Sequence, residues 1–240
     1  MIRKISLLAI FTLSCFFSKT YAHALWIETA PTGKKGVAQE VRIFFGEYSE
    51  GNPTPTAKWF SDTRGFNLVL ITPDNQEIKL TPTQQPQYFT ATFTPEKDGV
   101  YTLLMHHLVK EVYHGNRLDY NSSAQVKVGN VATAVVPSFT NIGINADNRA
   151  GFIKDQDISF TAFLDGKPAP KTEVEVVAPN GWSKKFYTDS TGSASFKPLW
   201  PGKYNLEFSR SDEKNGEHEG KPYKTEWRGA NSVVDVSNKK

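Results

Sequence analysis

The chain has 240 residues, a formal charge of +3 and a single cysteine, Cys15. A charge this close to neutral gives no reason to expect nucleic acid or an acidic membrane as a partner through bulk electrostatics. One cysteine cannot form an intramolecular disulfide, and the 17 glycines and 14 prolines spread along the chain are typical of an all-β protein with many turns.

The first residues have the features of an export signal. Arg3 and Lys4 precede the short apolar run Ile5–Phe17, and small residues follow near Ala22. The run is too short for a membrane-spanning helix, which needs roughly 20 apolar residues. We therefore expect residues 1–22 to be a cleaved signal peptide and the product to be exported to a bacterial periplasm.

The position of the cut stays open. Cleavage after Ala22 leaves His23 as the first residue, whereas cleavage after Ala24, in the small-x-small triplet AHA, leaves Leu25 first. Lipidation at Cys15 is a third alternative, although the residues before it fit a lipoprotein signal poorly.

Cleavage after Ala22 changes the chemistry of the mature chain. It removes Arg3, Lys4 and Lys19, which leaves 25 basic and 25 acidic residues, and it removes the one cysteine. A metal would then be held by histidine, carboxylate, the terminal amine or backbone oxygen, and imidazole suits nickel, copper, cobalt or zinc.

Short runs with strand character dominate the first half of the chain, and turn sequences such as Thr72–Gln76 separate them. The runs are Val41–Phe45, Phe66–Ile71, Gln76–Leu80, Tyr88–Phe93, Val100–Val109 and Ala124–Val128. No segment shows a sustained helical period.

Residues 129–152 are rich in small side chains and weakly patterned, and we interpret them as a crossing between two domains. A second set of strand-like runs follows: Asp157–Leu164, Thr172–Pro179, Ser183–Asp189, Gly192–Leu199, Gly202–Ser209 and Asn231–Val236. We therefore predict an all-β chain of two Ig-like or transthyretin-like β-sandwich domains, residues 23–130 and 151–240, with a linker at 131–150.

The two halves share the pattern F-x-P-x-x-x-G-x-Y, at Phe93–Tyr101 and at Phe196–Tyr204, and a proline-containing turn precedes each. Chance agreement is the alternative, and we favour two similarly built sandwiches. The second half, with the phrases LDGKPAPKTEVEVVAPNG, YTDSTGSASF and PGKYNLEF, resembles transthyretin-like and Cna-B-like modules. That resemblance implies a structural or docking domain.

Three of the five histidines, His106, His107 and His114, lie within residues 105–120. Neighbours on a strand face opposite sides, so at most one of His106 and His107 can face a given site. The pattern puts His107 on the more apolar face and His106 on the more solvated one. Taken singly, each is more readily explained as a surface residue near a β-bulge; together with a terminal His23, they favour a metal site.

A histidine at the mature N-terminus offers an amine and an imidazole on one residue. One or two side chains from a distant strand would complete a square or tetragonal set, which suits Cu(II) or Ni(II). Glu47, in FFGEYSEG, is a candidate carboxylate ligand, and a solvated loop charge is its alternative. His218 lies among acidic residues at 212–220, which we interpret as a mobile charged loop.

Motifs for catalysis are missing from the sequence. It has no G-x-S-x-G, no HExxH and no phosphate-binding loop, and a mature chain without cysteine excludes thiol catalysis. We therefore expect a protein that is not an enzyme.

The stretches AHALWIE, VRIFFGEYSEG and DGVYTLLMHH, with a transthyretin-like second half, together resemble the periplasmic proteins of nickel/cobalt uptake systems, the NikK-like or nickel-uptake substrate-specific domain family. The resemblance implies an exported accessory protein that binds Ni(II) or Co(II) and serves the membrane components of an energy-coupling-factor type transporter. The matching positions are His23, Glu47 and the pair His106 and His107.

Two alternatives stay open. GVYTLLMHHLVKEVYHG also resembles copper-resistance proteins of the CopC type, which would make Cu(II) the ligand, although Glu111-x-x-His114 replaces a tighter Asp-x-His spacing and the chain is longer by a domain. The contrasting class is an adhesion or carbohydrate-binding module, in which the histidines are incidental.

Overall fold

The computed structural model describes residues 23–131, 139, 141–148 and 151–238, so the expected signal peptide lies outside the described residues. Regular structure in this part of the chain is β-strand apart from three single-turn 3₁₀ helices, η1 (Tyr48–Glu50), η2 (Thr56–Lys58) and η3 (Thr63–Gly65). The predicted all-β sandwich fold is confirmed. No helix among these residues has the length and apolar composition needed to cross a membrane.

The first sheet belongs to the N-terminal half and has the strand order β1-β3-β8-β7, with β4 beside β3. Its strands are β1 (Ala24–Thr29), β3 (Gln39–Glu47), β4 (Asn52–Pro53), β7 (Thr83–Gln84) and β8 (Phe89–Phe93). Val41, Ile43 and Phe45 alternate with more exposed residues along β3, so one face of this sheet covers the first core.

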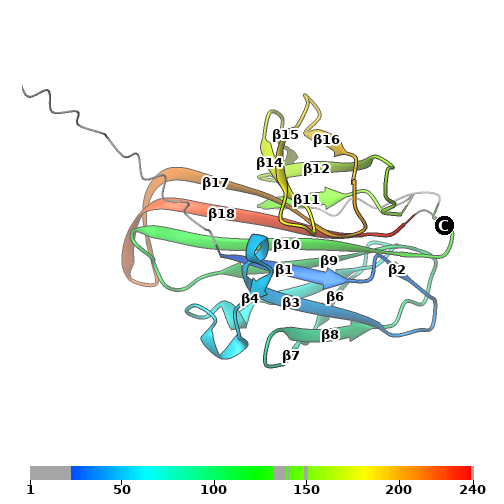
Figure 1. Ribbon diagram of the computed structural model, residues 1–240. Coiled ribbons are helices and arrows are strands. Elements are labelled where there is room, and N and C mark those ends of the chain that lie inside the picture. The colour runs from blue at the N-terminus through cyan, green and yellow to red at the C-terminus, as the bar shows by residue number, and fades with distance from the viewer. Residues whose placement is uncertain (1–22, 132–138, 140, 149–150, 239–240) are drawn as a thin grey trace, which may run out of the picture.

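The second sheet runs through both halves of the chain, in the order β15-β14-β17-β18-β10-β9-β5-β6, with β2 beside β10. Its strands are β2 (Thr32–Gly33), β5 (Asn67–Ile71), β6 (Glu77–Leu80), β9 (Gly99–Leu108), β10 (Asn116–Val128), β14 (Glu173–Val177), β15 (Ser183–Tyr187), β17 (Gly202–His218) and β18 (Lys221–Val236). The halves join where β10 pairs with β18 in parallel, and these long strands with β17 run lengthwise through the molecule (Figure 1).

A third sheet closes the C-terminal half. It has the order β11-β12-β13, with β16 beside β12. Its strands are β11 (Ile142–Ala146), β12 (Ile158–Leu164), β13 (Lys167–Pro168) and β16 (Ser193–Phe196). Together with β14, β17 and β18 it encloses the second core, and Figure 1 shows this layer on one side of β17 and β18 with the first sheet on the other.

The division into two halves differs in two ways from the predicted one. Five buried residues of the predicted linker form β11, because Ile142 and Ile144 pack into the second core. In addition, Trp227 on β18 packs against the first core. The halves are thus joined by a shared sheet and not only by a linker at 131–150.

The repeated F-x-P-x-x-x-G-x-Y pattern forms the same set of tyrosine hydrogen bonds and ring contacts in both halves. The hydroxyl of Tyr101 accepts the N–H of Lys97 at 3.0 Å and donates to the Lys97 carbonyl oxygen at 3.1 Å. The hydroxyl of Tyr204 makes the equivalent pair of bonds to Trp200, both at 3.0 Å. Each tyrosine ring also lies 5.6 Å from the phenylalanine that opens its pattern. The two halves of the chain therefore contain the same arrangement of tyrosine and backbone.

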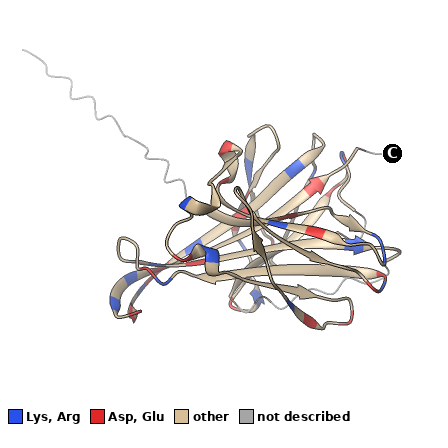
Figure 2. Ribbon diagram, turned by 90° about the horizontal axis from the view of Figure 1, so that it is seen from below, with Lys and Arg blue, Asp and Glu red and all other residues tan. Residues whose placement is uncertain are grey.

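Residues 212–220, expected to be a mobile loop, instead belong largely to the long β17–β18 hairpin, and this expectation was wrong. The pairing reaches His218 and Lys221, with a register shift between Glu213 and Gly216. The strands are solvated and charged here, so backbone pairing holds them and no apolar alternation marks them in the sequence. Figure 2 shows basic and acidic positions interspersed along the ribbon, in agreement with the balanced charge.

Candidate metal site

Antiparallel pairing of β1 and β3 brings His23 and Glu47 together. Ala24 pairs with Gly46, so His23, which precedes β1, lies beside Glu47, the last residue of β3. Gly46 has a φ of 145°, and an added Cβ would lie 3.0 Å from the backbone nitrogen of Thr54. This bend requires glycine, and it sets the position of the glutamate that follows.

The imidazole of His23 lies at the surface, next to a mostly buried carboxylate. The Nδ1 atom of His23 is 3.5 Å from Oε1 of Glu47, and the two side chains are 52% and 14% exposed. The ring of His23 stacks on Phe45, with 5.3 Å between centroids. In this arrangement Nδ1, the ring nitrogen nearer the backbone, is the one beside the carboxylate.

The carboxylate of Glu47 is electrostatically poorly satisfied. Burial raises its pKa, the neighbouring His23 opposes this, and Glu50 adds to the rise. Its Oε1 atom is buried and accepts no hydrogen bond from the described residues. A buried acceptor left unsatisfied costs about 1–3 kcal/mol, and a cation held beside it would remove that cost.

Negative charge also gathers where the two halves meet. Burial, together with the charges of Glu175 and Glu47, raises the pKa of Glu207 on β17 to about 7. Burial likewise raises the pKa of Tyr120 on β10, and the charge of Glu47 contributes to this rise. The Tyr120 ring meets Phe45 edge-on, 6.1 Å between centroids. This surrounding favours a bound cation over a bound anion.

His106 and His107 lie on opposite faces of β9, and each has its own carboxylate partner. Nε2 of His106 is 3.0 Å from Oδ1 of Asp119, and Nε2 of His107 is 3.3 Å from Oδ1 of Asp62. The two side chains are 50% and 7% exposed, which agrees with the predicted faces. The hydrogen bond to Asp119 raises the pKa of His106, whereas burial lowers the pKa of His107.

The remaining histidines have other surroundings. His114 lies in a turn with a φ of 48°, and its ring meets Tyr113 at 4.2 Å between centroids. Nε2 of His218 lies 2.9 Å from the carbonyl oxygen of Val109. Within the described ranges, no three side chains of His, Cys, Asp or Glu converge as a metal-binding group. Of the predicted residues, the structure brings together His23 and Glu47.

The sequence analysis did not select Asp62 or Asp119. Asp62 is 45 residues from the histidine it contacts, and no motif links the two. Asp119 is buried, and its carboxylate also accepts the side-chain amides of Asn121 and Asn141. Only the strand order brings these groups together.

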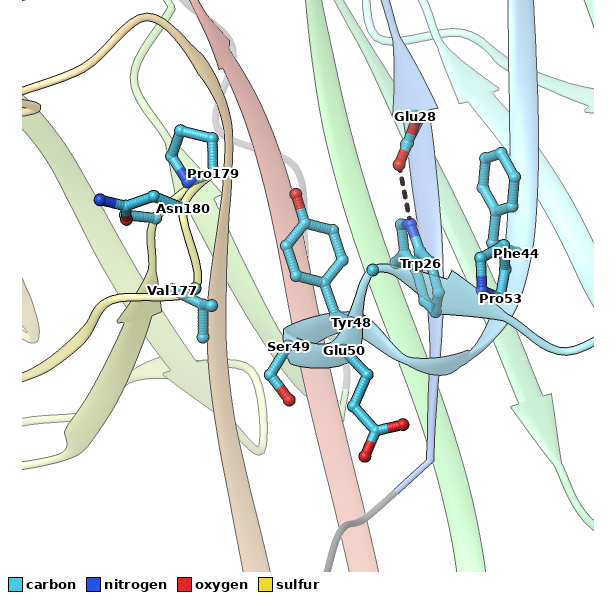
Figure 3. Close-up of a pocket in the computed structure, with 13 residues that line it drawn as sticks. Trp26, Glu28, Phe44, Tyr48, Ser49, Glu50, Pro53, Val177, Pro179 and Asn180 are labelled. Atoms are coloured by element: carbon cyan, nitrogen blue, oxygen red, sulfur yellow. Dashed lines mark hydrogen bonds between the residues drawn. The ribbon is translucent and has the colours of Figure 1, made fainter.

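A groove of about 410 Å³ lies where η1 meets the turn 178–181 of the second half. Figure 3 shows Tyr48 between Trp26 on one side and Val177 and Pro179 on the other. The indole N–H of Trp26 donates to Oε1 of Glu28 at 3.1 Å. The groove is therefore aromatic and acidic, and Tyr48 directly follows the glutamate of the candidate site.

Solved structures resemble the chain only distantly. A DUF4785 family protein from Legionella pneumophila aligns at 13% identity with a TM-score of 0.32, over 87% of this chain and 56% of that chain. The alpha-2-macroglobulin of Escherichia coli aligns at 12% identity with a TM-score of 0.30, over 90% of this chain and 20% of that chain. A segment of two fibronectin type-III domains from chicken tenascin aligns at 13% identity with a TM-score of 0.24, over 87% and 97%. The chain thus spans about half of the Legionella protein and a fifth of the macroglobulin.

No curated protein has a sequence that matches this chain. Residues 20–212 match a family described as a domain of unknown function, DUF4198. This match covers most of the chain, including β1, β3 and the candidate site. The chain therefore belongs to the DUF4198 family.

Proposed function

We propose that the chain is a periplasmic accessory protein of metal uptake, which binds Ni(II) or Co(II) through His23 and Glu47 and serves the membrane components of an energy-coupling-factor type transporter. One observation carries the metal-binding part of this proposal. The buried Oε1 of Glu47 accepts no hydrogen bond from the part of the chain that the structure describes, and it lies 3.5 Å from Nδ1 of His23.

The donor set has the chemistry that these ions prefer. When His23 is the first residue, its α-amine and Nδ1 can close a six-membered chelate ring, and Glu47 adds an oxygen. Two donor atoms that are each about 2.1 Å from one ion lie roughly 3.0–3.4 Å apart. The observed separation of 3.5 Å therefore needs only a small approach. Nitrogen donors with one carboxylate suit Ni(II) and Co(II).

Cu(II) is the alternative cargo for the same donors. In the order of divalent-ion affinities, copper exceeds nickel and cobalt at almost any nitrogen and oxygen site. A tighter binding of Cu(II) in solution would therefore not by itself identify the metal carried in the cell. A comparison of nickel and copper uptake in cells that lack the protein separates the two cargoes.

We leave His106, His107 and His114 out of the proposed ligand set. His106 and His107 are engaged by Asp119 and Asp62, from opposite faces of one strand. His114 lies in the turn beyond β9, with its ring against Tyr113. Their substitution is therefore a control for the site and not a test of it.

The proposal is tested in two steps. The intact mass of the exported protein shows whether the chain begins at His23, and a chain that begins at Leu25 would lack the site. Calorimetric titration with Ni(II) then compares the mature protein with E47Q and with a form that retains Ala22, with H114A as the matched control. We expect E47Q and the Ala22 form to lose at least about 100-fold in affinity, and H114A to be unchanged. Equal affinity in E47Q would disprove the proposed ligand set.

A further inference from the structure

Two tryptophans on neighbouring turns of the second half form an exposed aromatic patch. Trp182 and Trp200 are 47% and 37% exposed, and their rings meet at 6.2 Å between centroids. Leu199, 50% exposed, lies beside Trp200 in the chain. Large apolar side chains gathered at a surface mark an interaction site more often than single exposed ones do.

Both turns are held rigidly, so the patch is built into the fold. The tyrosine hydroxyl that closes the second sandwich bonds to the backbone N–H and carbonyl oxygen of Trp200. The N–H of Trp182 donates to Oδ1 of Asn180 at 3.1 Å, and the N–H of Ala178 donates to the carbonyl oxygen of Trp182 at 2.7 Å. Docking the patch on a surface therefore requires little ordering of the backbone in these turns.

The surroundings of the patch are basic. The segment 176–206 contains four lysines, Lys184, Lys185, Lys197 and Lys203, and one acidic residue, Asp189, whose carboxylate accepts hydrogen bonds from Thr191. Lys185 and Lys203 are paired with Glu173 and Glu28. Lys184 and Lys197 are exposed and have no acidic partner in the described part of the chain.

Acidic residues also lie near these turns: Glu28, which is paired with Lys203, and Glu50 line the groove beside the turn 178–181, and Asp155 lies next to Pro198. Asp155 donates its backbone N–H to the carbonyl oxygen of Pro198 at 3.0 Å. Its carboxylate lies 3.6 Å from Nζ of Lys154. The patch therefore offers exposed aromatic rings next to uncompensated positive charge.

We infer that the turns carrying Trp182 and Trp200 dock the protein on an anionic phospholipid surface, with the rings at the depth of the headgroups and Lys184 and Lys197 against the lipid phosphates. Tryptophan prefers the interface between lipid and water, and lysines near an anionic membrane each add attraction. The net charge of the whole chain is near neutral, so it gives no indication of this local basic patch.

The turn before Trp182 borders the groove that η1 also lines, whereas the turn before Gly202 lies far from His23 along the strands. Ile27 and Glu207 occupy the same position along the strand direction. The N–H of Ile27 donates to Ser122, and Ser122 pairs with Asn231 in the second sheet. Asn231 pairs in turn with Glu207. His23 and the turn before Gly202 lie on opposite sides of this position, about nine strand positions or roughly 30 Å apart. The inference is thus independent of the proposed function.

Vesicle flotation of the purified full-length exported protein tests the inference. We expect it to float with vesicles that contain phosphatidylglycerol and not with vesicles of phosphatidylcholine alone, and its tryptophan emission to shift to the blue. Removing both rings, in W182S with W200S, should weaken binding at least about tenfold, and K197Q should weaken it about fivefold. I78S, which removes another exposed apolar side chain, is the matched control and should bind normally.

Three results would overturn the inference: no flotation with anionic vesicles, equal flotation with neutral vesicles, or flotation that the double tryptophan variant does not reduce. A protein that is dimeric in solution and becomes monomeric in the double variant would also overturn it, because the patch would then join two copies. Circular dichroism and thermal melting establish that each variant is folded, and Ni(II) titration of the double variant separates a failure here from a failure of the metal site.

Discussion

Replacing Glu47 by glutamine perturbs a mostly buried carboxylate, one oxygen of which accepts no hydrogen bond from residues 23–131, 139, 141–148 and 151–238. The side chain is 14% exposed, and burial raises its pKa from 4.5, so folding disfavours its ionised form. An unsatisfied buried acceptor costs about 1–3 kcal/mol, whereas the neutral amide of glutamine can donate to Nδ1 of His23. Allowing for the partial exposure, we expect E47Q to raise the free energy of unfolding at neutral pH by about 1 kcal/mol, or about 2–4 °C in Tm.

The test uses the form that retains Ala22. In this form residue 23 has an amide nitrogen, so no charged terminal amine faces Glu47. The difference in stability between the wild type and E47Q should then depend on pH in a defined direction. A carboxyl whose pKa is raised on folding lowers stability once it ionises, so the wild type should lose stability relative to E47Q as the pH rises above 4.5. Below that pH the two proteins should melt alike.

Metal should reverse the order of stability in the mature form. A ligand that binds only the folded protein, at 100 times its Kd, adds about 2.7 kcal/mol. The wild type should gain this amount with Ni(II), and E47Q should gain little. Thermal melts with and without Ni(II) measure both effects, with E50Q, an exposed neighbour, as the control. The reasoning is refuted if, in the Ala22 form, E47Q has a lower Tm than the wild type. It is also refuted if Ni(II) raises the Tm of mature E47Q as much as that of the mature wild type.

The remaining predictions concern the rest of the fold. Y101F should lower the free energy of unfolding by about 1–3 kcal/mol in chemical denaturation, because two backbone N–H groups lose their acceptor, and Y204F should cost a similar amount. E207Q should stabilise the protein above pH 4.5, by an amount that grows up to about pH 7 and stays constant beyond it, because folding disfavours the ionised form of Glu207; its melts should depend less on pH than those of the wild type. H106Q should leave the affinity for Ni(II) unchanged in titration calorimetry, since His106 contacts Asp119.

The strands that were predicted well from the sequence are those in which apolar residues alternate with polar ones, so that one face packs against a core. Val41–Phe45 and Val100–Val109 were predicted within two residues of β3 and β9 at each end. Strand β11 was missed, although all five of its residues are buried, because Gly143 and Asn145 interrupt its apolar pattern. The outer part of β17 was missed because its side chains are mostly solvated, and backbone pairing with β18 and contacts such as His218 with Val109 hold it in place.

The candidate site shows the same limit. His23 and Glu47 were both selected from local sequence, but their contact depends on the register of β1 and β3. The pairing of His106 with Asp119 depends in turn on the packing of β9 against β10, and no spacing rule contains it. Strand periodicity predicts which face a residue occupies, whereas the partner across the sheet is decided by topology.

Glu47 links the candidate site to the second half of the molecule. Its charge raises the pKa of Glu207, which lies on the sheet that both halves share. A cation bound at Glu47 would cancel that charge and so lower the pKa of Glu207. By linkage, ionisation of Glu207 must then strengthen cation binding by the same factor. If a metal binds at Glu47, the C-terminal half can thus affect its affinity through the charge of the buried Glu207, without supplying a ligand of its own.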